Sequence, residues 1–190
     1  GGSKRAVADL IITLIINNST TYFQVRTDAS GDYTILCSDL SNGDIIGIYV
    51  DEASNNASLV TSVAGSGGLA LNLYENNVTV RSESGAAALT NANMRTIEQN
   101  TKTNSDRLLY GTDASNNVTI DGTYKLFQQT GTYTPGANVT VGFTTRLDGT
   151  TNLGNLTFTI NSNGLLIING TLNLDHDDTS VVVNGGIDNN

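Results

Sequence analysis

The chain has 190 residues, of which 14% are charged and 38% hydrophobic, and it carries a net charge of −9 with no Trp, one Pro and one Cys. The acidic balance excludes binding to nucleic-acid phosphates or to an anionic membrane through a basic face, because both need clustered Lys and Arg. The single cysteine, Cys37, excludes an internal disulfide. Abundant β-branched residues, Asn and Gly favour many short strands joined by tight turns.

The first distinctive segment is an apolar run from Leu10 to Ile16 that follows a basic start. It is too short to span a bilayer, and it lacks the cleavage site of a signal peptide. Apolar residues recur at the helical spacing i, i+3, i+4, i+7 and i+8, which predicts a short helix within an anchoring segment, residues 1–19. The side chains assigned to anchoring are Val7, Leu10, Ile11, Leu14 and Ile15. The alternative is a strand that is apolar on both sides and needs cover on both faces.

Residues 20–86 are typical of a small antiparallel β region. Strand-like runs such as Tyr22–Arg26 and 45–50 alternate with turn residues such as Asn42-Gly43-Asp44. Cys37 lies in one of these runs, where a buried small hydrophobe is the simplest interpretation. Nucleophilic chemistry at this thiol would need a nearby base, and the only histidine, His176, belongs to an Asp-rich turn near the other end of the chain.

Residues 87–110 show the a/d spacing of a heptad repeat, which predicts a helical joint between two β regions. The positions that follow this spacing are Ala87, Thr90, Met94, Ile97, Thr101, Asn104 and Leu108. The apolar seam is thin, so such a helix must pack against its own domain or against copies of itself. The residues assigned to self-association are Met94, Ile97, Thr101, Asn104 and Leu108.

Residues 111–190 predict an antiparallel β-sandwich. Alternating runs such as 138–143 and 156–160 are separated by turn pairs such as Asn163-Gly164, which are hairpin signals. The pattern T-D-A-S-x-x-x-T-I occurs at Thr27 and again at Thr112, which suggests a duplicated β unit or the same turn chemistry used twice. The predicted fold is therefore mainly β, with an N-terminal apolar helix, a small antiparallel region, a coiled-coil-like joint and a C-terminal sandwich.

Candidate chemistry is sparse. The turn that contains Asp175, Asp177 and Asp178 beside His176 offers weak metal ligands, but adjacent residues point in different directions and a solvated turn is the better interpretation. No nucleotide-binding, zinc-binding or nucleophile motif occurs, so we expect neither an enzyme nor a cofactor. Asn-x-Ser/Thr triplets recur, but in a chain this rich in Asn and Thr we attribute them to chance. They include triplets that begin at Asn18, Asn56, Asn77, Asn117, Asn138, Asn155 and Asn169.

Taken together, these segments resemble structural proteins of tailed bacteriophages, namely fibre, head-fibre and decoration subunits. The opening S-K-R-A-V-A-D-L-I-I-T-L-I-I-N-N-S at 3–19 is similar to N-terminal helices of virion proteins from phages that infect Bacteroidota, including crAss-like phages. The heptad stretch resembles a trimeric stalk, and the Thr/Asn/Gly-rich region from residue 111 resembles a fibre tip. The resemblance implies a homotrimer on the virion surface, attached to other virion proteins by its N-terminus, with a host-surface glycan as a further partner.

Two other classes stay open on the sequence. In an extracellular filament of bacteria or archaea, the apolar run 10–16 would be a strand donated to the next subunit. Such a filament would be an open-ended helical polymer instead of a closed trimer. A weaker alternative is a secreted carbohydrate-binding or hydrolytic domain, which would need a metal at Asp175–Asp178 or an acidic cleft.

Overall fold

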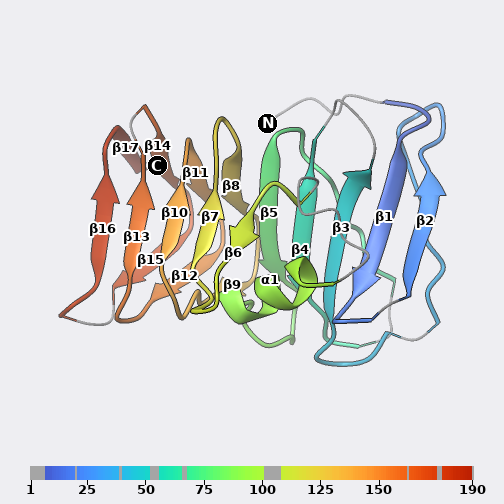
Figure 1. Cartoon of the computed structure of the whole chain (residues 1–190), viewed down its shortest axis with the longest axis horizontal. Helices are drawn as coiled ribbons and strands as arrows, with labels where there is room; N and C mark the ends of the chain where they lie inside the picture. The colour runs from blue at the N-terminus through green and yellow to red at the C-terminus, as the bar shows by residue number, and fades with distance from the viewer. Residues whose placement is uncertain are drawn as a thin grey trace.

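The computed structural model describes residues 7–19, 21–38, 40–51, 56–65, 68–100, 108–161, 163–174 and 177–189. Within these ranges the chain is mainly β-structure with a single α-helix, and it winds into a β-solenoid of about six turns (Figure 1). A solenoid stacks short structural repeats so that each turn contacts mainly its neighbours.

The elements in chain order begin with an N-terminal block of five strands and the helix. These are β1 (Ile11–Ile16), β2 (Tyr22–Arg26), β3 (Ile45–Asp51), β4 (Ser58–Ser62), β5 (Asn77–Ser82) and α1 (Asn91–Glu98). Shorter strands follow. They are β6 (Gly111–Thr112), β7 (Val118–Ile120), β8 (Lys125–Gln128), β9 (Thr132–Tyr133), β10 (Val139–Val141), β11 (Thr145–Leu147), β12 (Thr150–Leu153), β13 (Thr157–Ile160), β14 (Leu165–Ile168), β15 (Thr171–Leu174), β16 (Ser180–Val183) and β17 (Gly186–Asn189).

Successive strands of the solenoid belong to three different sheets, one on each face. From β7 onward the chain visits the sheets in a fixed rotation, so that β7, β10, β13 and β16 share one face, β8, β11, β14 and β17 a second, and β9, β12 and β15 a third. Within each of these stacks the strands are parallel. Val139 pairs with Val118 one turn earlier and with Phe158 one turn later, so a turn takes about 20 residues.

The second face continues into the N-terminal block and becomes a nine-stranded sheet in the order β17-β14-β11-β8-β5-β4-β3-β1-β2. The ladder is parallel as far as β4 and antiparallel from β4 through β3 and β1 to β2. β1 is thus an inner strand of the sheet, with a partner on each edge.

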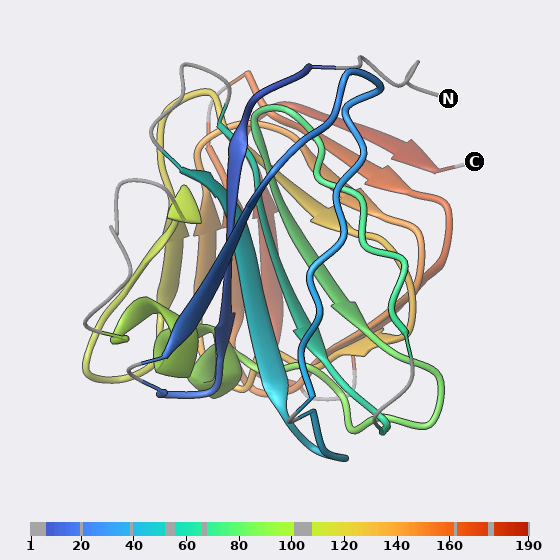
Figure 2. The ribbon, with the colours of Figure 1, turned by 90° about the vertical axis from the view of Figure 1, so that its right-hand side faces the viewer.

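In the N-terminal block, each side of this sheet faces a separate hydrophobic core. The larger core fills the solenoid and runs from Ile15 in the N-terminal block to Leu166 in β14, so both halves of the chain share it. The smaller core lies on the other side of the N-terminal block and includes Ile12, Leu14 and Ile48. Figure 2 shows α1 on the side of the larger core and two long connecting segments on the side of the smaller one.

The predicted N-terminal helix is wrong, because the apolar run forms β1. Nearly every residue of this segment is apolar, so apolar residues can be found in it at the spacing of a helix as well as at the spacing of a strand. A strand buried on both faces needs such a composition. Ile12 and Leu14 enter the smaller core, and Ile15 enters the larger one.

The predicted antiparallel sandwich is also wrong, although several of its turns exist. Asn163 adopts the expected left-handed conformation, with φ 69°. This turn, however, joins β13 to β14, which lie in different sheets, and each strand pairs in parallel with strands of neighbouring turns. Turn residues show where the chain bends. They do not show whether the next strand returns beside the previous one or continues around a coil.

The predicted coiled-coil joint is replaced by a helix of eight residues, α1. Thr90 caps its N-terminus in a capping box with Asn93, and Gln99 ends it. This is too short for three heptads, and residues 101–107 of the expected seam lie outside the described residues. No helix in the described ranges is both long and apolar enough to cross a membrane.

Candidate functional site

The five residues assigned to anchoring lie on β1 and just before it. Leu14 and Ile15 are buried on opposite faces of the sheet, and Val7, Leu10 and Ile11 are half-buried. These side chains therefore hold the N-terminal block together within their own chain. That they also anchor the chain to a partner stays a prediction.

The residues assigned to self-association lie inside the fold where the structure describes them. Met94, Ile97 and Leu108 have no exposed surface and belong to the larger core. Thr101 and Asn104 lie outside the described residues. In the folded subunit, Met94, Ile97 and Leu108 are not accessible to a partner helix, and α1 instead packs against β3 and β6.

The weak metal candidates Asp177 and Asp178 lie in the turn between β15 and β16, and Asp175 falls outside the described residues. Within the described part of the chain, no three side chains of His, Cys, Asp or Glu gather where they could hold a metal ion.

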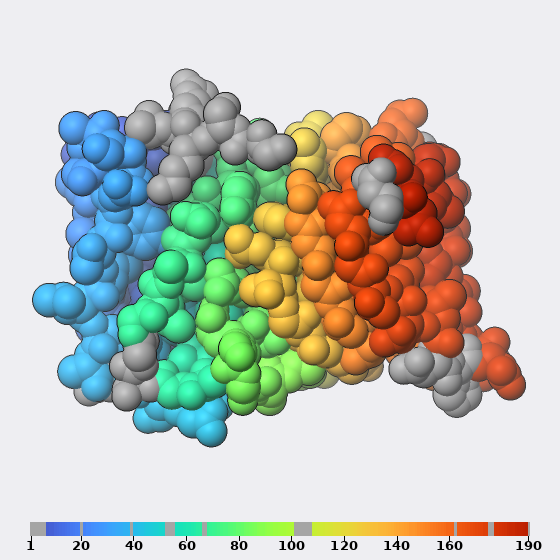
Figure 3. Space-filling view, turned by 180° about the vertical axis from the view of Figure 1, so that it is seen from behind, coloured from blue at the N-terminus to red at the C-terminus, as the bar shows by residue number. Residues whose placement is uncertain are grey.

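A large hollow in the described structure lies on the outer side of the N-terminal block. We call it the outer cavity. It measures about 940 Å³, and it lies between the sheet face formed by β1 and β3 and two extended segments that cross this face. The first connector (residues 28–38) lies between β2 and β3, and the second connector (residues 68–75) lies between β4 and β5. Figure 3 shows them side by side, the first in light blue and the second in green.

The two connectors run in opposite directions, as the sheet topology requires. β2 and β3 are both antiparallel to β1, so the first connector must run back along them. β4 and β5 are parallel, so the second connector must also run back. Because β3 and β4 are antiparallel to each other, the two return paths are opposed.

Both connectors have the alternation of half-buried strands. In the first, Tyr33, Ile35 and Cys37 are half-buried and the residues between them are exposed. In the second, Leu69, Leu71 and Leu73 are half-buried and Ala70 and Asn72 are exposed. Alternation of this kind is typical of a strand with one face on a core. Neither connector, however, belongs to any of the sheets that the structure describes.

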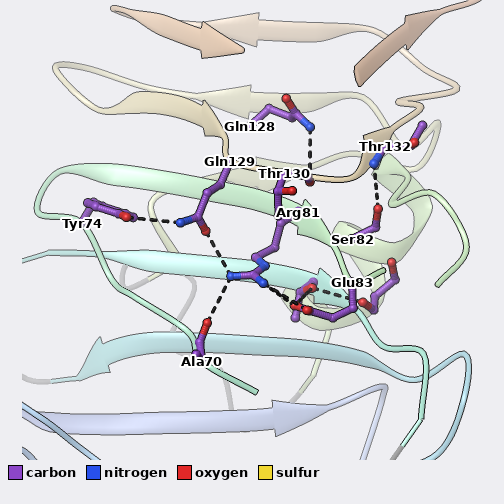
Figure 4. Close-up of polar contacts among 11 residues, drawn as sticks. Ala70, Tyr74, Arg81, Ser82, Glu83, Gln128, Gln129, Thr130 and Thr132 are labelled. Atoms are coloured by element: carbon purple, nitrogen blue, oxygen red, sulfur yellow. Dashed lines mark hydrogen bonds and ion pairs between the residues drawn. The ribbon is translucent and has the colours of Figure 1, made fainter. Parts of the chain in front are cut away.

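The second connector is fastened to the solenoid by Arg81 of β5 (Figure 4). The guanidinium donates to the carbonyl oxygen of Ala70 and to Oε1 of Gln129, both at 3.2 Å, and Nη2 lies 2.8 Å from Oε1 of Glu83. Gln129 donates onward to the hydroxyl of Tyr74 at 3.2 Å. The side chains of Arg81 and Glu83 are only 12% and 18% exposed, so this ion pair is less screened by water than a surface pair.

Tyr33 joins the two connectors, because its hydroxyl donates a hydrogen bond to the carbonyl oxygen of Leu71 at 2.7 Å. Burial raises the pKa of this hydroxyl from 10.0 to about 12. The hydroxyl is therefore neutral at physiological pH and acts as a donor across the cavity.

We expect Tyr33 to make the fold sensitive to alkali. A folded-state pKa above the unfolded value contributes stability that is complete below pH 10 and is lost as the pH rises toward 12. Chemical denaturation across this range should show a steeper loss for the natural protein than for Tyr33→Phe. At neutral pH, Tyr33→Phe should cost about 1 kcal/mol through the lost hydrogen bond. Equal alkaline profiles for the two proteins would contradict the placement of Tyr33.

The sequence contained part of this site. The repeated T-D-A-S pattern is one turn used twice, since Asp28 Oδ1 accepts from the backbone of Ser30 at 2.8 Å, and Asp113 Oδ1 accepts from that of Ser115 at 2.8 Å. One copy opens the first connector and the other precedes β7. The cavity itself could not be predicted from the sequence. Its walls are connectors whose residues alternate as in a strand, although neither connector pairs with a strand of the described sheets.

Comparison with known proteins gives no relative: no protein-family model, no curated protein and no solved structure matches the chain.

Proposed function

We propose that the chain is a non-enzymatic virion structural protein, a fibre or decoration subunit that forms homo-oligomers and displays its solenoid on the particle surface. The observation that supports this best is the unbroken parallel stack β4-β5-β8-β11-β14-β17, one strand from each of the turns. Neighbouring turns are joined by backbone ladders and by one continuous core. Such a stack makes a stiff projection, which a fibre or decoration subunit needs.

In this proposal the N-terminal block attaches to other virion proteins and the later turns project away from them, where they could contact a host-surface glycan. The net charge of −9 supports a surface location, because self-repulsion keeps copies on one particle soluble. The filament alternative has lost its main support, since β1 is paired along both edges in its own chain. Donating it to a neighbour would break both ladders.

The location is tested by immunogold electron microscopy on purified particles from the source of this sequence, with antibodies against the whole chain. We expect label at the particle periphery and the chain's peptides in the mass spectrum of the particles. Label on cell-surface filaments, or particles without these peptides, would contradict a virion role.

Self-association must use a surface other than the buried face of α1. The exposed apolar side chains Leu174, Val182 and Ile187 lie on β15, β16 and β17, and we assign the contact to them. Ile187→Asp is expected to lower the mass measured by light scattering from that of an oligomer to that of the 19.9 kDa chain. Leu36→Asp is the matched control, because Leu36 is also exposed but lies on the first connector. A natural protein that is already monomeric would contradict the oligomer.

A further inference from the structure

We propose that the outer edge of β2 pairs with the same edge of a second copy of this chain. The two strands are antiparallel and related by a two-fold axis at Gln24, so the nine-stranded sheets of the two copies continue into each other. This contact is separate from the one assigned to β15, β16 and β17, because β2 and β17 lie at opposite ends of the sheet. It does not depend on the virion role.

β2 is an edge strand whose outer side is open. It pairs with β1 along one side and with no other strand of the described sheets. It is the outermost strand on the right of Figure 1, and Figure 2 looks onto that side of the molecule. An edge with unpaired N–H and C=O groups is a template for another strand, and proteins often block such edges with proline or lysine. The sequence of β2, Tyr-Phe-Gln-Val-Arg, contains neither.

The direction of the backbone groups shows which residues of β2 would make the pairing. Thr27, the residue after β2, donates its N–H to the carbonyl oxygen of Leu10, the residue before β1, at 3.0 Å. The backbone groups of an antiparallel strand face its two sides alternately, so every second residue back from Thr27 also faces β1. The groups that face outward are therefore those of Tyr22, Gln24 and Arg26. They make no backbone hydrogen bond within the described part of the chain.

The five residues of β2 are complementary to themselves, which favours a second copy over any other strand. With Gln24 opposite its own copy, Tyr22 lies opposite Arg26, and Phe23 lies opposite Val25. Each of the three outward-facing residues then donates one backbone hydrogen bond across the axis and accepts one. Moving the axis to Phe23 or to Val25 brings only two of these three residues opposite each other within β2. The axis at Gln24 is therefore the register that satisfies the whole edge.

The side chains of β2 agree with this register. Phe23 and Val25 are half-buried and pack against the smaller core. Placed opposite each other, they join the smaller cores of the two copies through pairs of an aromatic and a β-branched side chain, which stabilise antiparallel strands. On the other face no like charges meet, because Arg26 lies opposite Tyr22. Arg26 keeps its ion pair with Asp9 at 2.9 Å, since the contact requires no charge from it.

Two strands of five residues form a small contact, so the pair is weak in dilute solution. It is populated where copies are held close together, because the local concentration is then high. Light scattering on Ile187→Asp therefore still gives the mass of a single chain. The experiment has to trap the pairs as they form.

The test traps pairs by disulfide formation, with oxidised glutathione as the oxidant. It uses the whole chain with Cys37→Ala, which removes the natural thiol, and Ile187→Asp, which removes the other contact. Gln24→Cys should give cross-linked dimer at least about tenfold faster than Thr119→Cys, an exposed position on β7. The reason is that Cα atoms of a hydrogen-bonded antiparallel pair lie about 5.5 Å apart, a distance that a disulfide spans.

Tyr22→Cys and Arg26→Cys test the register and leave Gln24 in place. Neither should cross-link alone, because the two copies of each thiol lie about 14 Å apart along the strands. An equal mixture of the two should form the mixed dimer, identified by its mass. Adding Gln24→Pro to both should abolish this dimer, since the proline removes an outward N–H and no bond to β1. Circular dichroism verifies that the proline variants are folded.

The proposal is overturned if Gln24→Cys cross-links no faster than Thr119→Cys, which measures random collision. It is also overturned if the mixture of Tyr22→Cys and Arg26→Cys cross-links no faster than either variant alone. Mixed dimers that persist in a folded chain with Gln24→Pro would likewise reject a backbone ladder at this edge. None of these results bears on the location of the protein, which the immunogold experiment tests separately.

Discussion

Gly131→Ala is expected to destabilise the protein by about 3 kcal/mol, measured as the free energy of unfolding in denaturant. Gly131 has φ +70°, a conformation that side chains with a Cβ rarely adopt, and an added Cβ would overlap the backbone oxygen and the Oγ of Ser82. Ser82 cannot easily move away, because its Oγ accepts from the backbone N–H of Thr132 at 2.7 Å and its own N–H donates to Thr130 at 3.3 Å (Figure 4).

Gly136→Ala is the matched control for this effect. Gly136 has nearly the same backbone conformation, with φ +72°, but its added Cβ would meet nothing closer than 4.0 Å. Gly136→Ala should therefore lower the free energy of unfolding only through the strain of a side chain at positive φ, by about 1 kcal/mol. The difference between the two variants measures how closely successive turns approach at the corner near Gly131. Equal losses would mean that the corner is open and that the turns are stacked less closely than described.

The same corner shows why the solenoid needs small residues there. Gln128 is fully buried, accepts from the backbone N–H of Gly149 at 2.5 Å and donates to the carbonyl oxygen of Gly131 at 3.0 Å. Its amide thus occupies the inside of the bend, where a Cβ on Gly149 would have to lie. The backbone also links turns here, since Thr150 donates to Gly131 and Thr171 donates to Gly149, both at 2.9 Å.

The composition is enough to predict a β-rich chain, but the repeat of the solenoid is visible in the sequence only through Asn-x-Ser/Thr triplets, which a composition rich in Asn and Thr also explains by chance. Asn-Val-Thr begins at Asn77, Asn117 and Asn138, and these triplets lead into β5, β7 and β10. The asparagines link consecutive turns, because Asn117 Oδ1 accepts from the backbone of Asn138 at 3.0 Å and Asn138 Oδ1 accepts from that of Thr157 at 2.7 Å. The turns differ in length, so no fixed period marks the repeat in the sequence.

The heptad spacing misled for a different reason. A helix that packs one face on a globular core places apolar residues three and four apart, as a coiled coil does. Met94 and Ile97 have this spacing because they reach into the larger core. The neighbouring Asn91 is also buried, where it accepts from the hydroxyl of Tyr133 at 2.5 Å and donates to the carbonyl oxygen of Ala137 at 3.1 Å. Only the three-dimensional context distinguishes these two uses of the same pattern.

Ile97 and Gly47 offer the sharpest test of this interpretation, because α1 packs on β3 at this pair. Ile97→Ala should lower the free energy of unfolding by about 3 kcal/mol, since a fully buried side chain leaves a cavity. The loss should not depend on protein concentration, whereas the same change at a coiled-coil interface would make stability concentration-dependent.

Gly47→Ala alone should cost about 2 kcal/mol, because its Cβ would overlap Cγ2 of Ile97. In the double variant that methyl is gone, and the nearest remaining atom is Cβ of residue 97, at 3.4 Å from the new methyl. The double variant should therefore be about as stable as Ile97→Ala alone, a coupling of about 2 kcal/mol between the two sites. Additive losses would show that α1 does not rest on β3, and would reopen the helix as a contact between subunits.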